Sequence, residues 1–260
     1  MKETKFELAA KIIWDSWQGG KVLSCLPDDL VPNSRSEAYK IQSFYENISE
    51  KGVLGWKIAA TSKAGQNHIG ASGPMAGRIL NEKVYRFNEK IDLSNNTMSV
   101  AELEFVFEIG KTLKPNDNEY SEEEVMESVK NLYSGIEFPD SRFKNYADLG
   151  EEYLIADNAC AHHFVLGSKL PDIWRSIDLS AHAVELRVMD GIKEKGLGSN
   201  VLGGPTIALT WLVNELSQNN ITLHAGKMVT TGTCTVPLPV KKGDLIIADY
   251  GKLGNLEFQL

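Results

Sequence analysis

The sequence predicts an α+β protein, with helices before about residue 50 and strands dominating after it. Apolar residues recur at helical spacing in the first part, alternating segments follow, and residues 226–260 combine short strands with glycine-containing turns. Tight turns between strands are typical of antiparallel hairpins, whereas parallel βαβ units need long crossovers. We expect a single catalytic domain over 1–260, with a helical N-terminal extension at 1–50 and a β-rich core at 51–260.

Sequence signals at helix ends place three helices, and apolar residues at helical spacing place a fourth over residues 1–17. Ser34 and Glu37 have the spacing of a capping box. Ser121 and Glu124 repeat that spacing, and Pro205 suits the first turn of a helix. The helices are expected over residues 1–17, 34–48, 121–133 and 203–216. Strands are expected over 53–62, 100–110, 135–140, 162–167 and 180–191, and in the C-terminal segment.

The composition is that of a globular protein with an acidic surface. The chain has 260 residues, 42% of them hydrophobic and 24% charged, and 27 basic against 35 acidic residues give 27 − 35 = −8. This charge disfavours nucleic acid and anionic membranes as partners. Cys25, Cys160 and Cys234 lie far apart, which argues against a disulfide framework or a thiolate zinc site. Segment 1–17 is amphipathic rather than a signal peptide, so we expect a cytoplasmic protein.

Glutamates alternate with large apolar residues in the segment 100–110, "VAELEFVFEIG". Because residues two apart in a strand share a face, Glu102, Glu104 and Glu108 point the same way. The opposite face is apolar and is expected to be core. The glutamate face is either the exposed side of an ordinary strand or a site, since two carboxylates at this spacing can converge on a hard cation.

A third carboxylate and a lysine occur in similar surroundings. Glu137 lies between Ile136 and Phe138 and is either a surface acid at a strand end or a third ligand. Three carboxylates without a histidine cluster favour Mg²⁺ or Mn²⁺ over zinc. Lys57, between Trp56 and Ile58, is either a snorkelling lysine, a cation beside an anionic substrate, or a proton carrier with a depressed pKa. His162 and His163 are expected to point to opposite faces of a strand.

Several segments, taken together, carry a family resemblance. They are "GWKIAATSKAGQ", "AELEFVFEIG", "GIEFPDSRF", "DNACAHHFVLG", "VLGGPTIALTWLVNEL" and "TGTCTVPLPVKKGDLIIADYGKLG". In this order they resemble the 2-keto-4-pentenoate hydratase and 4-oxalocrotonate decarboxylase family, within the fumarylacetoacetate hydrolase superfamily. The resemblance covers nearly the whole chain. It implies a mixed β-roll or sandwich after an N-terminal helical layer, in a homo-oligomer.

The resemblance also implies a site. Glu102, Glu104 and Glu137 match the family's ligands of Mg²⁺ or Mn²⁺, and Lys57 matches its substrate lysine. Substrate contacts are expected from Ser62, Thr233 and Thr235. The implied reaction is hydration of a small 2-hydroxy-2,4-dienoate, or its 2-oxo tautomer, to a 4-hydroxy-2-oxo acid, as in the catabolism of aromatic compounds. The alternatives are a decarboxylase of the 4-oxalocrotonate type, an acylpyruvate C–C hydrolase, and a non-catalytic metal-binding homologue.

Two positions depart from the family pattern. Met75, in "GPMAG", stands where several members carry an acidic residue that could activate water. This favours the non-catalytic alternative, whereas the retained Lys57 argues against it. Cys160 stands where a serine is expected. The far end of the substrate could be read by Arg78, Arg142 or the histidine pair.

Overall fold

The structure of the protein is a computed structural model that describes residues 3–189 and 191–260. The helices are α1 Lys5–Gly19, α2 Arg35–Ser43, α3 Tyr45–Ile48, α4 Lys63–His68, α5 Glu122–Ser128, α6 Glu151–Ala156 and α7 Pro205–Gln218. The strands are β1 Val53–Ala59, β2 Met75–Leu80, β3 Val84–Tyr85, β4 Val100–Ile109, β5 Val129–Phe138, β6 His163–Lys169, β7 Ala183–Val188, β8 Lys193–Leu197, β9 Met228–Thr233, β10 Leu238–Pro239, β11 Leu245–Asp249 and β12 Asn255–Gln259.

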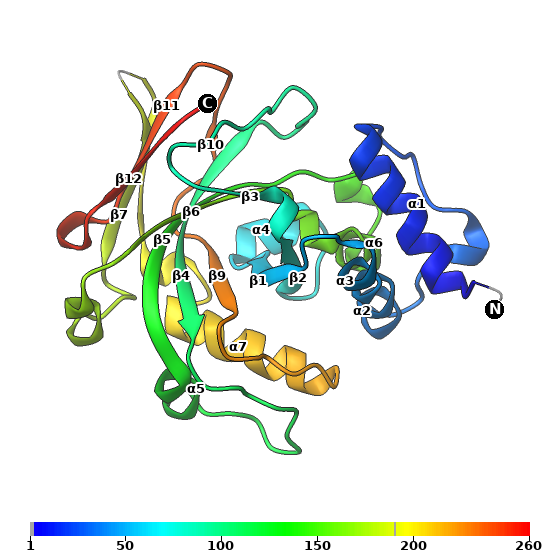
Figure 1. Ribbon diagram of the computed structural model, residues 1–260, viewed down its shortest axis with the longest axis horizontal. Coiled ribbons are helices and arrows are strands. Elements are labelled where there is room, and N and C mark those ends of the chain that lie inside the picture. The colour runs from blue at the N-terminus through cyan, green and yellow to red at the C-terminus, as the bar shows by residue number, and fades with distance from the viewer. Residues whose placement is uncertain (1–2, 190) are drawn as a thin grey trace.

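The strands form two sheets, which confirms the predicted α+β class (Figure 1). The larger sheet has the order β2-β1-β9-β4-β5-β6-β3, with β10 paired to β4, and the smaller has the order β12-β11-β7-β8. Most pairs are antiparallel, but β1 pairs with β9 and β3 with β6 in parallel. The larger sheet is therefore mixed, as the resemblance implied. Helix α7 packs near β9. The N-terminal helices gather at the right of Figure 1 together with α6.

The N-terminal helical layer forms as predicted, with one interruption. Helix α1 is capped by the Thr4 side chain, and Gly20 ends it in the left-handed conformation. The Ser34 hydroxyl accepts from the Glu37 N–H, but the Glu37 carboxylate bonds to Asn33 instead of completing the capping box. The helix predicted over 34–48 divides into α2 and α3, because the Phe44 N–H bonds three residues back and tightens the turn.

The helix predicted over 121–133 is too long. The capping box between Ser121 and Glu124 forms in both directions, but α5 ends at Ser128. Strand β5 begins at the next residue and pairs with β4 from Ile109↔Val129 to Glu102↔Glu137. The predicted strand over 135–140 is therefore the second half of a ten-residue strand. Pairing with a distant segment overrides the local helical pattern here.

The apolar face of β4 lies in the core, as its alternation predicted. Leu103, Phe105, Phe107 and Ile109 are fully buried. Tyr250 fastens the middle of the larger sheet: its hydroxyl lies 2.8 Å from the carbonyl oxygens of both Glu104 and Gly135, and it accepts the Gly135 N–H at 3.0 Å. The two strands that carry the glutamates are thus joined by a buried side chain as well as by their own ladder.

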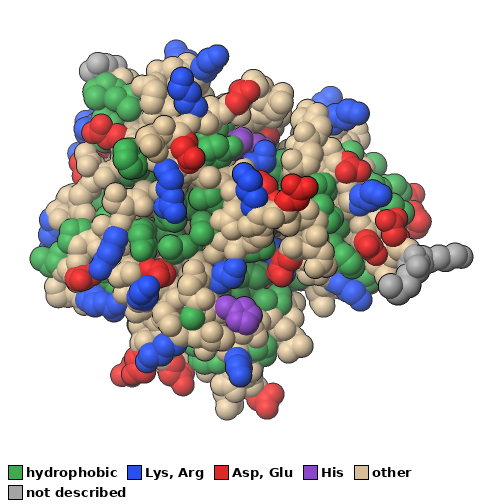
Figure 2. Space-filling model, viewed as in Figure 1, with side chains coloured by type: hydrophobic (Ala, Val, Ile, Leu, Met, Phe, Trp, Pro, Cys, Tyr) green, Lys and Arg blue, Asp and Glu red, His purple; other side chains and the backbone are tan. Residues whose placement is uncertain are grey.

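The molecular surface is mixed in charge. On the face shown in Figure 2, basic and acidic side chains are interspersed rather than separated into large patches of one sign. None of the helices in the described ranges is both long and apolar enough to cross a membrane.

Candidate metal and substrate site

Three glutamates meet at the centre of the larger sheet. Strand β4 supplies Glu102 and Glu104, and β5 supplies Glu137, which lies directly opposite Glu102 in the ladder. One carboxylate oxygen from each residue lies within 4.8 Å of the others. Glu104 and Glu137 are 0% and 2% exposed, and Glu102 is half-buried. The alternative of an ordinary solvent-facing strand does not fit this burial.

In two of these carboxylates, one oxygen has a protein partner and the second oxygen has none among the described residues. Glu104 Oε2 accepts the Gly232 N–H at 2.8 Å, and Glu137 Oε1 lies 3.1 Å from Lys57 Nζ. Glu104 Oε1 and Glu137 Oε2 are buried without a hydrogen-bond partner among the described residues. Leaving buried charged oxygens unpaired is costly. A hard divalent cation would satisfy them, so these residues fit Mg²⁺ or Mn²⁺.

Burial and mutual repulsion favour the protonated forms of Glu102 and Glu104 in the absence of metal. Burial, followed by the charge of Glu137, raises the pKa of Glu102 to about 7. The same causes, with Glu102 added, raise the pKa of Glu104 well above its ordinary value. A bound cation would take the place of these protons, because it offsets the repulsion directly.

Lys57 is part of this cluster and does not snorkel to solvent. It is 2% exposed on β1, and its Nζ also donates to the Ala159 carbonyl at 3.0 Å. Burial lowers the pKa of the ammonium, but the charges of Glu137, Glu102 and Glu104 outweigh burial and raise the pKa above its usual range. The interpretation of Lys57 as a proton carrier with a depressed pKa is therefore wrong for the protein without metal, because the three acids face the lysine.

The predicted substrate residues lie in two different places. The Thr233 hydroxyl donates to the Thr235 carbonyl at 3.0 Å, and the Thr235 hydroxyl is buried without a partner among the described residues. Thr233 pairs with Glu104 in the ladder, so this threonine segment borders the glutamates. Ser62 is exposed and caps α4 by accepting the Gly65 N–H. The structure therefore gives Ser62 a helix-capping role.

Gly232 connects the threonine segment to the cluster. Its φ of 100° suits glycine alone, and a Cβ there would collide with the Thr61 side chain. This conformation directs its N–H at Glu104. Thr230, two residues earlier, lies opposite Lys57 in the β1–β9 register, and its buried hydroxyl has no partner within the described ranges. Sequence reasoning missed Thr230, although its two-residue spacing from Gly232 on one strand was a usable signal.

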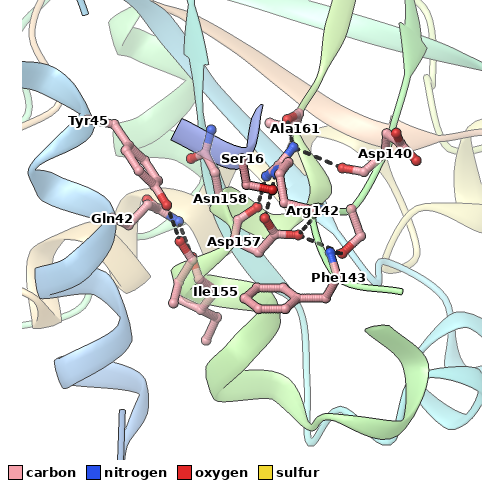
Figure 3. Close-up of polar contacts among 12 residues, drawn as sticks. Ser16, Gln42, Tyr45, Asp140, Arg142, Phe143, Ile155, Asp157, Asn158 and Ala161 are labelled. Carbon is pink, nitrogen blue, oxygen red and sulfur yellow. Dashed lines mark hydrogen bonds and ion pairs between the residues drawn. The ribbon is translucent and has the colours of Figure 1, made fainter. Parts of the chain in front are cut away.

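The two arginines suggested for the far end of the substrate are occupied elsewhere. Arg78 pairs with Glu46 and stacks on Trp56, and Arg142 pairs with Asp157. Both arginines are buried, so these contacts are structural. Figure 3 shows Arg142 bonded to Asp157, Ala161 and Asp140.

The histidine pair lies outside the glutamate cluster. His162 and His163 do not diverge as predicted: their ring centroids are 4.1 Å apart, because His162 precedes β6 and escapes its alternation. Both rings line a pocket of about 240 Å³ beside Arg142 and the end of α1. Burial lowers the pKa of His163 to about 3, so the ring is neutral at neutral pH.

Met75 and Gly77 lie on the same face of β2, and Gly77 pairs with Lys57 of β1. Lys57 pairs with Gly77 and Ala59 with Met75, so Met75 is the diagonal neighbour of Lys57. The Met75 side chain is 1% exposed. The position that carries an acid in several family members is thus an apolar wall here.

No protein-family model matches the chain, but curated relatives do. It is 29% identical over 255 residues to 2-keto-4-pentenoate hydratase of Paraburkholderia xenovorans (strain LB400), covering 96% of this chain and 93% of the relative. It is 28% identical over 253 residues to 2-keto-4-pentenoate hydratase 1 of Dechloromonas aromatica (strain RCB), covering 96% and 95%. The resemblance to the 2-keto-4-pentenoate hydratase family is confirmed.

Solved structures share the fold of this chain. The 4-oxalocrotonate decarboxylase from Pseudomonas putida G7, complexed with magnesium and adipate, aligns with a TM-score of 0.88 at 22% identity, covering 100% of this chain and 98% of that one. Fumarylpyruvate hydrolase from Pseudomonas aeruginosa, in complex with Mn²⁺ and pyruvate, aligns with a TM-score of 0.57 at 17% identity, covering 81% and 91%. The predicted fumarylacetoacetate hydrolase type of fold is therefore confirmed.

Proposed function

We propose that the protein is a divalent-metal-dependent hydratase, which adds water to a 2-hydroxy-2,4-dienoate and forms a 4-hydroxy-2-oxo acid. The observation that carries the proposal is the cluster of Glu102, Glu104 and Glu137 around Lys57. It occurs in a chain that aligns over 96% of its length with 2-keto-4-pentenoate hydratases. We also propose, from the resemblance, that the protein is cytoplasmic and a homo-oligomer. It has no nucleic-acid or membrane partner, in keeping with its net charge of −8.

Glu102, Glu104 and Glu137 are the proposed ligands of Mg²⁺ or Mn²⁺. Carboxylate oxygens are hard donors, which these ions prefer, and one oxygen each of Glu104 and Glu137 has no partner among the described residues. When bound, the cation supplies a Lewis acid that stabilises negative charge developing on the substrate oxygens. Gly232 keeps Glu104 turned toward the cluster, and Lys57 does the same for Glu137.

Lys57 is the proposed catalytic residue. Its ammonium has three N–H donors, and Glu137 and Ala159 accept two of them. The third is available to hold the substrate carboxylate or to pass a proton to the dienol. Protonation at C5 with loss of the 2-hydroxyl proton gives the 2-oxo-3-enoate, and water then adds to C4. The Thr235 hydroxyl, buried beside the cluster without a partner in the described chain, is a proposed substrate contact together with Thr233.

Decarboxylation of a 4-oxalocrotonate-type acid is the second candidate. Met75, which also suits the non-catalytic alternative, favours decarboxylation over hydration. A buried thioether cannot take a proton from water, so hydration lacks one general base at this position. Loss of CO₂ requires no activated water. The carboxylate cluster and Lys57 would serve either reaction, because both proceed through negative charge on the 2-oxygen.

A spectroscopic assay separates these candidates. The protein is mixed with 2-hydroxypenta-2,4-dienoate or 4-oxalocrotonate, with Mg²⁺, with Mn²⁺, or with a chelator. The proposal predicts metal-dependent loss of the dienoate and formation of 4-hydroxy-2-oxopentanoate. Release of CO₂ from 4-oxalocrotonate without hydration would favour the second candidate. Failure to consume either compound would contradict both and leave the non-catalytic alternative.

A further inference from the structure

The segment 155–161 passes beside Lys57 and is fixed on both sides. The Gln42 amide donates to the Ile155 carbonyl at 2.9 Å (Figure 3). The Tyr45 hydroxyl donates to the Ala156 carbonyl at 2.7 Å. At the last residue of the turn that follows, the Asp140 N–H donates to the Cys160 carbonyl at 3.0 Å. Arg142 pairs with the Asp157 carboxylate, so the segment is held before and after the part that reaches Lys57.

Between these anchors the backbone makes a left-handed turn. Asn158, Ala159 and Cys160 have φ angles of 58°, 51° and 59°. L-residues other than glycine avoid this region unless surrounding contacts impose it. The Ala159 carbonyl at the middle of the turn accepts from Lys57 Nζ at 3.0 Å. The unusual conformation therefore aims one carbonyl at the ammonium.

The Asn158 side chain holds the turn against strand β2. Its side-chain oxygen accepts the Arg78 N–H, and its side-chain nitrogen donates to the Arg78 carbonyl at 2.7 Å. The amide thus pairs with β2 as another strand would. Gly77, one residue earlier and opposite Lys57, allows this approach, because a Cβ there would collide with the Asn158 carbonyl.

We propose that Asn158 is a positioning residue: its amide fixes the turn whose Ala159 carbonyl holds the Lys57 ammonium in place. The proposal rests on the proposed function, since it takes Lys57 as the residue that acts on the substrate. A lysine side chain is long and flexible, and its ammonium turns toward the strongest acceptors nearby. Without the Ala159 carbonyl, Lys57 would give a second donor to the glutamates and lose the orientation needed for substrate.

Asn158→Gly is the sharpest variant. Glycine adopts left-handed φ without steric cost, so the chain path stays accessible while the amide is lost. Misplacement of a catalytic group by about 1 Å costs on the order of 100-fold in rate. We expect kcat to fall about 10- to 100-fold, with KM and the affinity for Mg²⁺ within about threefold of the unchanged protein, because substrate and metal still meet their own contacts.

Asn214→Ala is the matched control. The Asn214 amide also pairs with both backbone groups of one residue, accepting from the Tyr120 N–H at 2.8 Å and donating to its carbonyl at 3.0 Å. It lies on α7 and makes no hydrogen bond to Lys57 or the glutamates among the described residues. We expect it to lower the melting temperature but leave kcat unchanged. Wild-type kcat in Asn158→Gly, or an equal loss in Asn214→Ala, would overturn the proposal.

A crystal structure of Asn158→Gly tests the positioning of Lys57 independently of any activity measurement. The proposal predicts that the distance from Lys57 Nζ to the Ala159 carbonyl exceeds 3.5 Å, or that the carbonyl turns away. A distance unchanged from 3.0 Å overturns it. If the unchanged protein turns over no dienoate or oxalocrotonate, the proposed function fails, and this structure still decides whether Asn158 positions Lys57.

Discussion

At the scale of single residues, two of the three carboxylates use their oxygens differently. One oxygen of Glu104 and one of Glu137 are fixed by a backbone N–H and by Lys57, and the others stay free. The two-residue spacing of the glutamates predicted that they would share a face. It could not predict that Lys57 would be charged, since the pKa depends on acids from two other strands.

Replacing Lys57 by Met tests its assigned role. Methionine keeps the length and apolar contacts of the stem but removes the donors to substrate. We expect turnover to fall at least about 100-fold, since general acid–base catalysis contributes roughly 100- to 10,000-fold. Calorimetry should show that Mg²⁺ still binds, because the three carboxylates remain. Turnover close to that of the unchanged protein would remove Lys57 from the mechanism.

The raised pKa of Glu102 makes metal binding depend on pH. A carboxyl group with a pKa near 7 carries a proton below that pH, and the proton must leave when a cation binds. Titration calorimetry should show affinity for Mg²⁺ at least about tenfold weaker at pH 6 than at pH 8. Without metal, the same shift stabilises the folded protein below the ordinary pKa of 4.5, and this contribution is lost as the pH rises through 7. A pH-independent affinity would contradict this account.

At the scale of elements, β4 and β5 form the rigid base of the site. Their ladder places Glu102 opposite Glu137, and the Tyr250 hydroxyl joins the two strands at Glu104 and Gly135. The sequence predicted β4 well, because its alternation is strict. It did not predict the first half of β5, since segment 129–133 has a helical pattern and becomes a strand only through pairing with β4.

Tyr250→Phe should weaken the base of the site. It removes the hydroxyl that serves the Gly135 N–H and leaves buried backbone groups with poorer hydrogen bonding. We expect the free energy of unfolding in urea to fall by about 1–3 kcal/mol. Tyr133→Phe is the control: its hydroxyl bonds to Glu108, which keeps Lys130 and Asn131 as partners. An equal or larger loss in Tyr133→Phe would contradict the role of Tyr250.

At the scale of the whole molecule, distant parts of the chain build one site. Strand β1 pairs in parallel with β9, which brings Lys57 opposite Thr230, and the segment 155–161 reaches the same lysine from another part of the fold. The order of motifs predicted the family and the mixed sheet. It could not predict Thr230 or Asn158, because their roles depend on the register between strands and on a turn that local sequence does not specify.

Metal binding should stabilise the whole chain. At a metal concentration of 100 times Kd the gain is about 2.7 kcal/mol, which should raise the melting temperature by roughly 5–10 °C. Glu104→Gln should abolish the shift. Glu108→Gln should keep it, because Glu108 lies farther along the same strand, outside the cluster. The reverse pattern in calorimetric melting would mean that the cation binds elsewhere.

The most direct measurement is anomalous diffraction from crystals soaked in Mn²⁺. We expect one strong peak with an oxygen of each of Glu102, Glu104 and Glu137 about 2.0–2.2 Å away, as for a hard octahedral cation. We also expect that Lys57 Nζ remains close to the Ala159 carbonyl. A peak at another place, or a cation that leaves one of the three glutamates unbound, would contradict the assignment of these glutamates as the metal ligands.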